Sequence, residues 1–147
     1  SIILLLSLKI KRKQIISLVI FGLILILVTD QLTNLCKVQV GRLRPCFDFQ
    51  LKDLVRLVKS SCGGKFSFFS GHASNSFALA FFFGRVVKRH FKMVNIILIF
   101  IAGLISYSRI YIGVHYPLDI FCGMIVGSVI GIVFYRIWEK TKFSSGY

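Results

Sequence analysis

The sequence predicts an all-α membrane protein, a polytopic bundle of transmembrane helices. Hydrophobic residues make up 56% of the 147 residues, and the mean hydropathy is +0.79. Soluble domains contain roughly 45–50% apolar residues. The apolar residues form runs long enough to cross a hydrocarbon core of roughly 30 Å. Basic residues gather where these runs end, which is typical of the flanks of membrane helices.

We expect a single membrane domain over 1–147 with four complete helices, at about 14–36, 72–88, 93–108 and 117–138. Residues 1–8 read as the end of a further helix. Because the chain starts without methionine inside an apolar run, we expect it to be N-terminally truncated. A secretory signal peptide at 1–28 is disfavoured, since the basic cluster follows the first apolar run and no small-residue cleavage site appears.

The one long polar region, about 37–69, is expected to form a loop on one side of the membrane. Within it, apolar and basic residues alternate at helical spacing, as in Leu51, Leu54, Val55 and Val58 against Lys52, Arg56 and Lys59. This pattern predicts a short amphipathic helix lying in the membrane interface. A helix packed against the protein would show the same pattern.

Charge predicts the orientation. Most of the 19 Lys and Arg residues lie in segments 9–13 and 85–92 and in the C-terminal tail. The positive-inside rule places these in the cytoplasm and the long loop outside.

Oxidation is possible outside the cytoplasm, so we predict a disulfide between Cys46 and Cys62 in the long loop, with Cys36 and Cys122 unpaired in the membrane. The net charge of +14 could also suggest nucleic-acid binding, but the clustering at helix ends argues against it.

The segment 108–119 carries an arginine, a histidine and an aspartate between the last two expected helices. Pro117 favours the first turn of a helix, so His115 lies just before a helix start and Asp119 in its first turn. A carboxylate there can reach one imidazole nitrogen, fix the tautomer and leave the other nitrogen free as a nucleophile. The alternative is an ordinary polar crossing between two membrane helices.

Two further polar clusters are expected at the same membrane face. One is Lys37 with Arg44, and the other is Ser70 to His72 at a helix start, where Ser70 is a natural N-cap. Three cations, counting Arg109, and the free N–H groups of a helix start would suit a dianionic phosphate. Arg42, outside these clusters, is interpreted as surface or headgroup-facing. Asp30 either pairs with Lys37 or reaches interfacial water.

The motifs Lys37-x6-Arg44-Pro45, Ser70-Gly71-His72 and Ser108-Arg109-x5-His115-x3-Asp119 resemble the three-part signature of the type 2 phosphatidic acid phosphatase superfamily, which includes the vanadium-dependent haloperoxidases. The resemblance spans about 14–138. It departs from the family pattern at Phe69, where proline is usual, and in showing fewer than six membrane helices.

The resemblance implies a metal-independent hydrolase without a cofactor. It makes His115 the nucleophile that forms a phosphohistidine, Asp119 its orienting carboxylate and His72 the proton donor. The phosphate-binding residues that it implies are Lys37, Arg44, Ser70, Gly71 and Arg109.

The substrate implied is a lipid phosphate at the outer face of a bacterial-type inner membrane, such as phosphatidylglycerol phosphate, phosphatidic acid, undecaprenyl diphosphate or a lipid A phosphate. A non-catalytic protein that binds or transports anionic lipid is the alternative. It is disfavoured because binding alone requires only the cations, and not His72, His115 and Asp119. A haloperoxidase is disfavoured because those members of the superfamily are soluble and larger.

Overall fold

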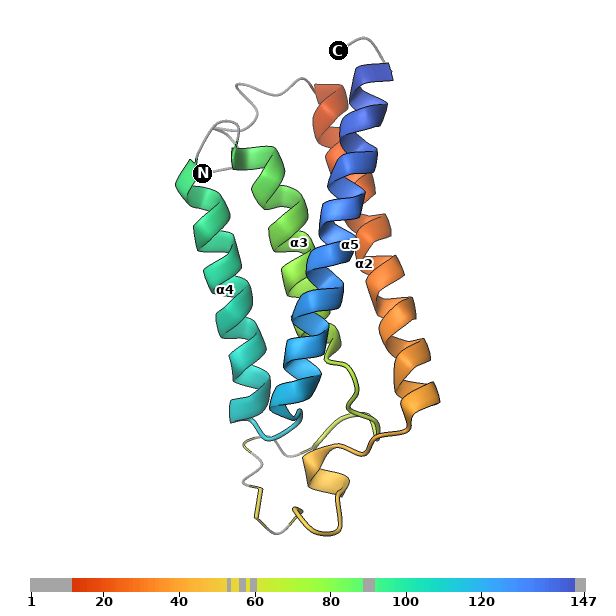
Figure 1. The fold of residues 1–147 in the computed structure, drawn as a ribbon, viewed down its shortest axis with the longest axis vertical. Coiled ribbons are helices and arrows are strands. Elements are labelled where there is room, and N and C mark those ends of the chain that lie inside the picture. The colour runs from red at the N-terminus through yellow and green to blue at the C-terminus, as the bar shows by residue number, and fades with distance from the viewer. Residues whose placement is uncertain (1–11, 53, 56–57, 59–60, 89–91, 145–147) are drawn as a thin grey trace.

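The computed structural model describes residues 12–52, 54–55, 58, 61–88 and 92–144. These residues form four long helices, α2 (Arg12–Val40), α3 (Gly71–Lys88), α4 (Lys92–Tyr111) and α5 (Pro117–Ser144), and a short 3₁₀ helix, η1 (Pro45–Phe47). The long helices run side by side, and the described residues contain no strand (Figure 1). The predicted all-α bundle is confirmed, and each helix contains the expected range, most with a few extra residues.

The chain is a multi-pass membrane protein. Among the described residues, α2, α4 and α5 are each long and apolar enough to cross a bilayer. The fourth helix, α3, begins with the polar residues His72, Ser74 and Asn75, and it packs against all three of the others. Because its neighbours cover much of its surface, α3 tolerates polar residues that a lipid-facing helix would not.

Helices α3 and α5 approach each other through a row of small residues. On α5, Gly123, Gly127 and Gly131 recur every four residues and so lie on one face. A Cβ atom at Gly123 would lie 2.7 Å from the carbonyl oxygen of Ser70, and one at Gly127 would overlap the carbonyl of Ser74. Small residues allow this kind of close helix packing within a membrane. The contact fixes the N-terminal half of α5 against the N-terminal half of α3.

At the opposite end of the bundle, an aromatic core joins α2, α3 and α5. Phe82 is fully buried and stacks on Phe21, while Trp138 packs edge-on against Phe82. The indole Nε1 of Trp138 also donates a hydrogen bond to Ser17 Oγ over 3.2 Å. These contacts hold the three helices together at the end away from the long loop.

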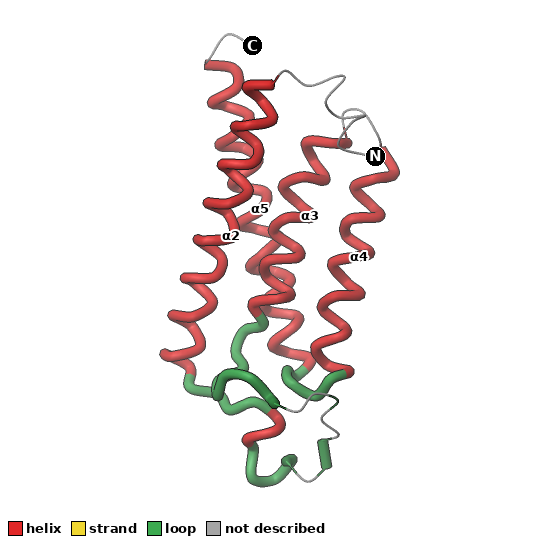
Figure 2. Tube along the Cα trace, turned by 180° about the vertical axis from the view of Figure 1, so that it is seen from behind, coloured by secondary structure: helices red, strands yellow, loops and turns green. Residues whose placement is uncertain are grey.

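All four helix ends that carry the predicted site residues meet at the end of the bundle that bears the loop (Figure 2). Two glycines with positive φ turn the chain there. Gly41 (φ 63°) follows α2, and its N–H donates to Lys37 O over 3.0 Å. Gly113 (φ 74°) follows α4 and begins the turn to His115. Glycine adopts this left-handed conformation without the cost that a Cβ atom imposes.

The loop between α2 and α3 is held by a short antiparallel bridge and a disulfide. Leu43 bridges to Phe66, flanked by hydrogen bonds from Arg44 N–H to Lys65 O (3.1 Å) and from Ser67 N–H to Arg42 O (2.8 Å). Cys46 and Cys62 are joined by a disulfide, the pairing that the sequence predicts, and Cys36 and Cys122 are free and half-buried.

The predicted amphipathic helix is wrong for the part of the loop that the structure describes. Residues 51, 52 and 54 form turns and residue 55 a bend, while Arg56 and Lys59 lie outside the described residues. Leu54 is 80% exposed and Val58 57% exposed, while Leu51 and Val55 are half-buried, so the apolar positions do not form one packed face. Short helices are marginal without such packing, which accounts for the isolated turns. The expected helix end at 1–8 also lies outside the described residues.

Candidate active site

A cavity of about 300 Å³ opens where the helix ends meet the loop. Its wall holds five of the predicted catalytic and phosphate-binding residues, together with loop and turn residues. The lining residues are Lys37, Arg44, Ser61, Cys62, Gly63, His72, Arg109, Ile112, Val114 and His115. The cavity therefore combines three cationic side chains with two imidazoles, brought from α2, the loop, α3, α4 and the turn before α5.

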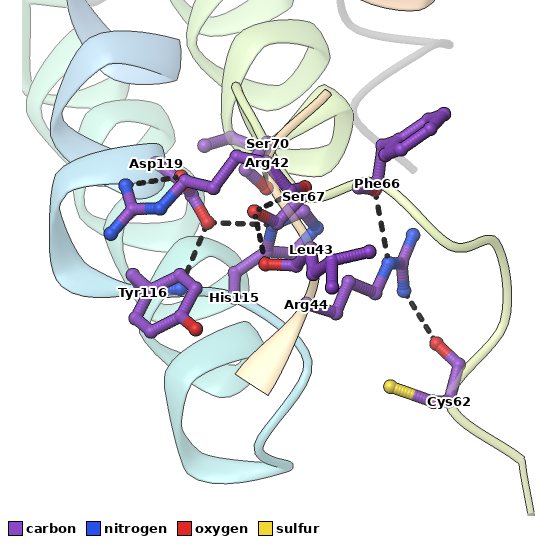
Figure 3. Close-up of polar contacts among 11 residues, drawn as sticks. Arg42, Leu43, Arg44, Cys62, Phe66, Ser67, Ser70, His115, Tyr116 and Asp119 are labelled. Carbon is purple, nitrogen blue, oxygen red and sulfur yellow. Dashed lines mark hydrogen bonds and ion pairs between the residues drawn. The ribbon is translucent and has the colours of Figure 1, made fainter. Parts of the chain in front are cut away.

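His115 lies in the wall of this cavity with Asp119 directly behind it (Figure 3). Asp119 is fully buried, and its Oδ2 lies 3.5 Å from His115 Nδ1, in contact but longer than an ordinary hydrogen bond. The same Oδ2 accepts a hydrogen bond from Tyr116 N–H over 2.9 Å. A carboxylate beside Nδ1 favours the tautomer that carries its proton there. The Nε2 nitrogen then carries no proton, and its lone pair is free.

Burial is the main cause that lowers the pKa of His115 from its usual value of 6.5. The nearby carboxylate of Asp119 acts in the opposite direction, and the positive charge of Arg44 adds to the lowering. The imidazole is therefore neutral at physiological pH, which is the form required of a nucleophile.

Arg44 is held in the cavity wall by carbonyl groups of its own loop. Its Nη1 donates to Cys62 O over 2.6 Å, and its Nε donates to Phe66 O over 3.2 Å. A guanidinium has five N–H donors, so those not used by the loop remain for a ligand. Burial lowers the pKa of Arg44, and arginine side chains remain protonated in proteins. Gly63 allows the close approach, because a Cβ atom there would lie 3.2 Å from Arg44 Nη1.

Two of the predicted phosphate ligands, Ser70 and Gly71, are not part of the cavity wall. The Oγ of Ser70 caps α3 by accepting from Ala73 N–H over 3.4 Å, and its own N–H donates to Asp119 O over 3.0 Å. Gly71 lies beside Lys37, whose Nζ is 4.0 Å from the position of a Cβ atom. Both residues thus fix the start of α3 beside Asp119 and Lys37.

Arg42 differs from its sequence interpretation as a surface or headgroup-facing residue. Its Nη1 lies 3.2 Å from Asp119 Oδ1, and its guanidinium stacks over the Tyr116 ring at 4.0 Å from the centroid. The Tyr116 hydroxyl in turn donates to Asp48 Oδ2 over 3.0 Å. Burial, and then this hydrogen bond, raise the pKa of Tyr116. Sequence reasoning missed this cluster because its members lie far apart along the chain.

Asp30 makes a contact that neither of the two sequence interpretations includes. Its Oδ1 accepts a hydrogen bond from Asn75 Nδ2 over 2.7 Å, which links α2 to α3. Asn75 lies about one helical turn from His72. The contact therefore helps to set where α2, and with it Lys37, stands relative to the start of α3.

Comparison with known proteins agrees with this arrangement. Lipid A 4'-phosphatase of Bacteroides thetaiotaomicron is 40% identical over 113 residues, which are 76% of this chain and 49% of that protein. Phosphatidylglycerophosphatase B of Bacillus subtilis is 35% identical over 131 residues, 82% of this chain and 60% of that protein. The chain therefore spans about half to three fifths of the length of these relatives.

A solved structure has the same fold. The crystal structure of the transmembrane PAP2-type phosphatidylglycerolphosphate phosphatase from Bacillus subtilis superposes with a TM-score of 0.67 at 26% identity. The match covers 90% of this chain and 72% of that one.

The fold and the cavity define a helical membrane protein with a cationic, two-histidine site at one face of the bilayer. The chain belongs to the PAP2 superfamily, whose family model matches residues 15–143.

Proposed function

We propose that this protein hydrolyses the phosphate ester or diphosphate of a membrane lipid through a phosphohistidine intermediate. The observation that carries the proposal is the pairing of His115 with the buried Asp119, at a cavity that also holds His72 and three cationic side chains. A site that only binds phosphate has no use for an oriented, neutral imidazole.

In the first step, Nε2 of His115 attacks phosphorus, the Nε2–P bond forms and the bond from phosphorus to the lipid oxygen breaks. His72 gives its proton to that oxygen, and Asp119 stabilises the positive charge that develops on the His115 ring. In the second step, His72 takes a proton from water, the water oxygen attacks phosphorus, and the Nε2–P bond breaks to release inorganic phosphate.

Negative charge on the non-bridging oxygens is balanced by Lys37, Arg44 and Arg109. Arg44 is held by the loop before substrate arrives, so little reorganisation is needed as the transition state forms. These three cations supply the electrostatic stabilisation of the transferring phosphoryl group, and we expect the reaction to proceed in the presence of a chelator.

The names of the relatives suggest which lipid phosphates to test first. Lipid A 4'-phosphatase of Porphyromonas gingivalis, 37% identical over 117 residues, joins the Bacteroides protein of the same name. We therefore place a lipid A phosphomonoester first, followed by phosphatidylglycerol phosphate, phosphatidic acid and undecaprenyl diphosphate.

The distribution of Lys and Arg supports an active site on the extracytoplasmic face of the inner membrane, with the C-terminus in the cytoplasm. In that orientation, a green fluorescent protein fused after Tyr147 would fluoresce and an alkaline phosphatase fused there would be inactive. The reverse pattern would contradict this orientation.

The test is phosphate release in mixed micelles with chelator present, across the four lipids, with His115→Ala in parallel. We expect release by the parent and none above background by the variant, because no other group replaces the nucleophile. Lys52→Ala, at an exposed position of the loop, serves as a matched control and should retain parent activity. Equal release by parent and His115→Ala would contradict the mechanism, and lipid binding without release would favour the non-catalytic alternative.

A further inference from the structure

We infer that Arg42 is a positioning residue for the nucleophile, holding the Asp119 carboxylate in the orientation that His115 requires. The inference rests on the proposed function, since it assigns a role within the same site. It concerns a residue that lies outside the cavity wall and acts through another side chain.

The first argument is the division of the Asp119 carboxylate between two sets of partners. Oδ1 lies 3.2 Å from Arg42 Nη1, whereas Oδ2 faces Tyr116 N–H at 2.9 Å and His115 Nδ1 at 3.5 Å. The contact to Arg42 therefore opposes rotation of the carboxylate, which would turn Oδ2 away from His115. Asp119 is fully buried, so without Arg42 its Oδ1 would lose its charged partner.

The second argument is that Arg42 is itself fixed at two points, its guanidinium and its backbone carbonyl. Its guanidinium lies over the Tyr116 ring at 4.0 Å, and the Tyr116 hydroxyl donates to Asp48 Oδ2 over 3.0 Å. Its carbonyl accepts hydrogen bonds from the N–H (2.8 Å) and the Oγ (3.3 Å) of Ser67. The backbone of Arg42 is thus hydrogen-bonded and its guanidinium is stacked. Such an arginine loses little further conformational entropy when it binds a carboxylate.

The third argument separates Arg42 from the phosphate-binding cations. Figure 3 shows the Arg42 guanidinium directed toward Asp119 and Tyr116, and that of Arg44 directed away from them, toward Phe66 and Cys62. Arg44 lines the cavity and Arg42 does not. The two arginines lie two residues apart, yet one faces the phosphate site and the other faces the back of the catalytic histidine.

The kinetic test compares Arg42→Gln and Arg42→Lys with the parent and with Lys52→Gln, a loop cation that is exposed. We expect Arg42→Gln to lower kcat about 10-fold to 100-fold, the range seen when a partner that orients a site residue is removed. KM and the inhibition constant for inorganic phosphate should stay at the parent values, because the cavity cations remain. Arg42→Lys should recover part of kcat, since an ammonium keeps the charge but not the planar stack. Unchanged kcat in Arg42→Gln, or weaker binding of inorganic phosphate with kcat unchanged, would overturn the inference.

A spectroscopic test separates the role of Arg42 from the activity itself. The chain contains three histidines, so a ¹⁵N-histidine spectrum in detergent can be assigned with single-residue variants. We expect the His115 tautomer with the proton on Nδ1 to dominate in the parent, and its population to fall in Arg42→Gln. An identical tautomer population in both proteins would overturn the inference. Parent protein that releases no phosphate would contradict the proposed function, while the spectrum would still decide the role of Arg42.

The stack of Arg42 on Tyr116 gives a third test, a double variant. It shows whether the two residues act through one contact or whether each change lowers kcat separately by destabilising the protein. Tyr116→Leu removes the ring and the hydroxyl that contacts Asp48, and we expect it to lower kcat less than Arg42→Gln does. Combined with Arg42→Gln, it should cause almost no further loss, because both changes act on one contact to Asp119. Losses of kcat that multiply in the double variant would contradict the coupling between Tyr116 and Arg42.

Discussion

At the scale of single residues, the environment of His115 sets how activity depends on pH. Burial, together with the charge of Arg44 and Lys37, lowers the pKa of His115 below 6.5, against the opposing effect of Asp119. The neutral, reactive imidazole therefore persists into mildly acidic solution.

We predict that the acidic limb of the kcat/KM profile lies below pH 6.5, the usual pKa of histidine, because this limb reports the essential base of the free enzyme. The free energy of unfolding should also decrease as the pH is lowered. The unfolded chain binds a proton at His115 more readily, so the stability present above pH 6.5 is lost as the pH falls through the lower pKa of the folded state. Phosphate-release kinetics and melting curves from pH 4.5 to 8 would check both trends. An acidic limb above pH 6.5 would contradict the prediction.

Site residues that lie close together in the sequence could be assigned to one motif from their spacing alone. His115 and Asp119 are four apart across a proline helix start, so local geometry brings them together. The partner of Asp119 on its other side, Arg42, lies 77 residues away in sequence. No local pattern encodes that contact, and a basic residue in a polar loop is usually solvated. Its assignment to the surface missed the contact with Asp119, although the side chain keeps 35% of its surface exposed.

At the scale of secondary-structure elements, the close contact between α3 and α5 places the start of one helix against the start of the other. Gly127 is the tightest point of the row of glycines, since a Cβ atom there would overlap Ser74 O. Gly103 on α4 is also in a membrane helix, but a Cβ atom there would meet nothing within 4 Å. The two glycines form a matched pair for one experiment.

We predict that Gly127→Ala destabilises the fold by about 1–3 kcal/mol, the usual cost of inserting a methyl group into a packed contact. Gly103→Ala should leave stability unchanged or raise it slightly, because alanine is the better helix former. The melting temperature in detergent would measure both, and phosphate release should fall with Gly127→Ala because Ser70 donates to Asp119 O at the same contact. Equal melting temperatures for the two variants would contradict the importance of this packing.

Helix boundaries were predictable where a residue dictates them by its own chemistry. Pro117 begins α5, Ser70 caps α3 and Gly41 follows α2. The described part of 51–59 forms turns and bends and no helix, because helical spacing says nothing about whether a surface exists for the apolar side to cover. The sequence did not reveal the row of glycines on α5 as a packing surface, because glycines in an apolar segment can be assigned to a helix contact only when the facing helix is known.

At the scale of the whole molecule, the loop is braced so that distant parts of the chain form one cavity. The Cys46–Cys62 disulfide closes the loop, and the carbonyl of Cys62 holds Arg44 over 2.6 Å. Loss of the disulfide should therefore disturb a phosphate-binding cation as well as stability.

We predict that Cys46→Ser lowers phosphate release mainly through a higher KM, and lowers stability by about 3 kcal/mol, as expected for a closed loop of roughly 15 residues. Treatment of the parent with reductant should have the same effect. Cys36→Ser with Cys122→Ser is the control, since these thiols are free and should change neither quantity. Intact mass with and without reductant would show the disulfide, and an oxidised parent with two reactive thiols at 46 and 62 would contradict the pairing.

The length of α2 has a consequence for how such a site meets its substrate. Its 29 residues extend about 43 Å at 1.5 Å per residue, which exceeds the hydrocarbon core, and Lys37 occupies the last turn. We therefore expect the cavity to stand at the level of the lipid headgroups. Under the proposed function, a lipid would then react without leaving its leaflet, and collisions would take place in two dimensions. The turnover rate should follow the mole fraction of substrate in the micelle or bilayer rather than its bulk concentration, and diluting the substrate with inert detergent should slow the reaction.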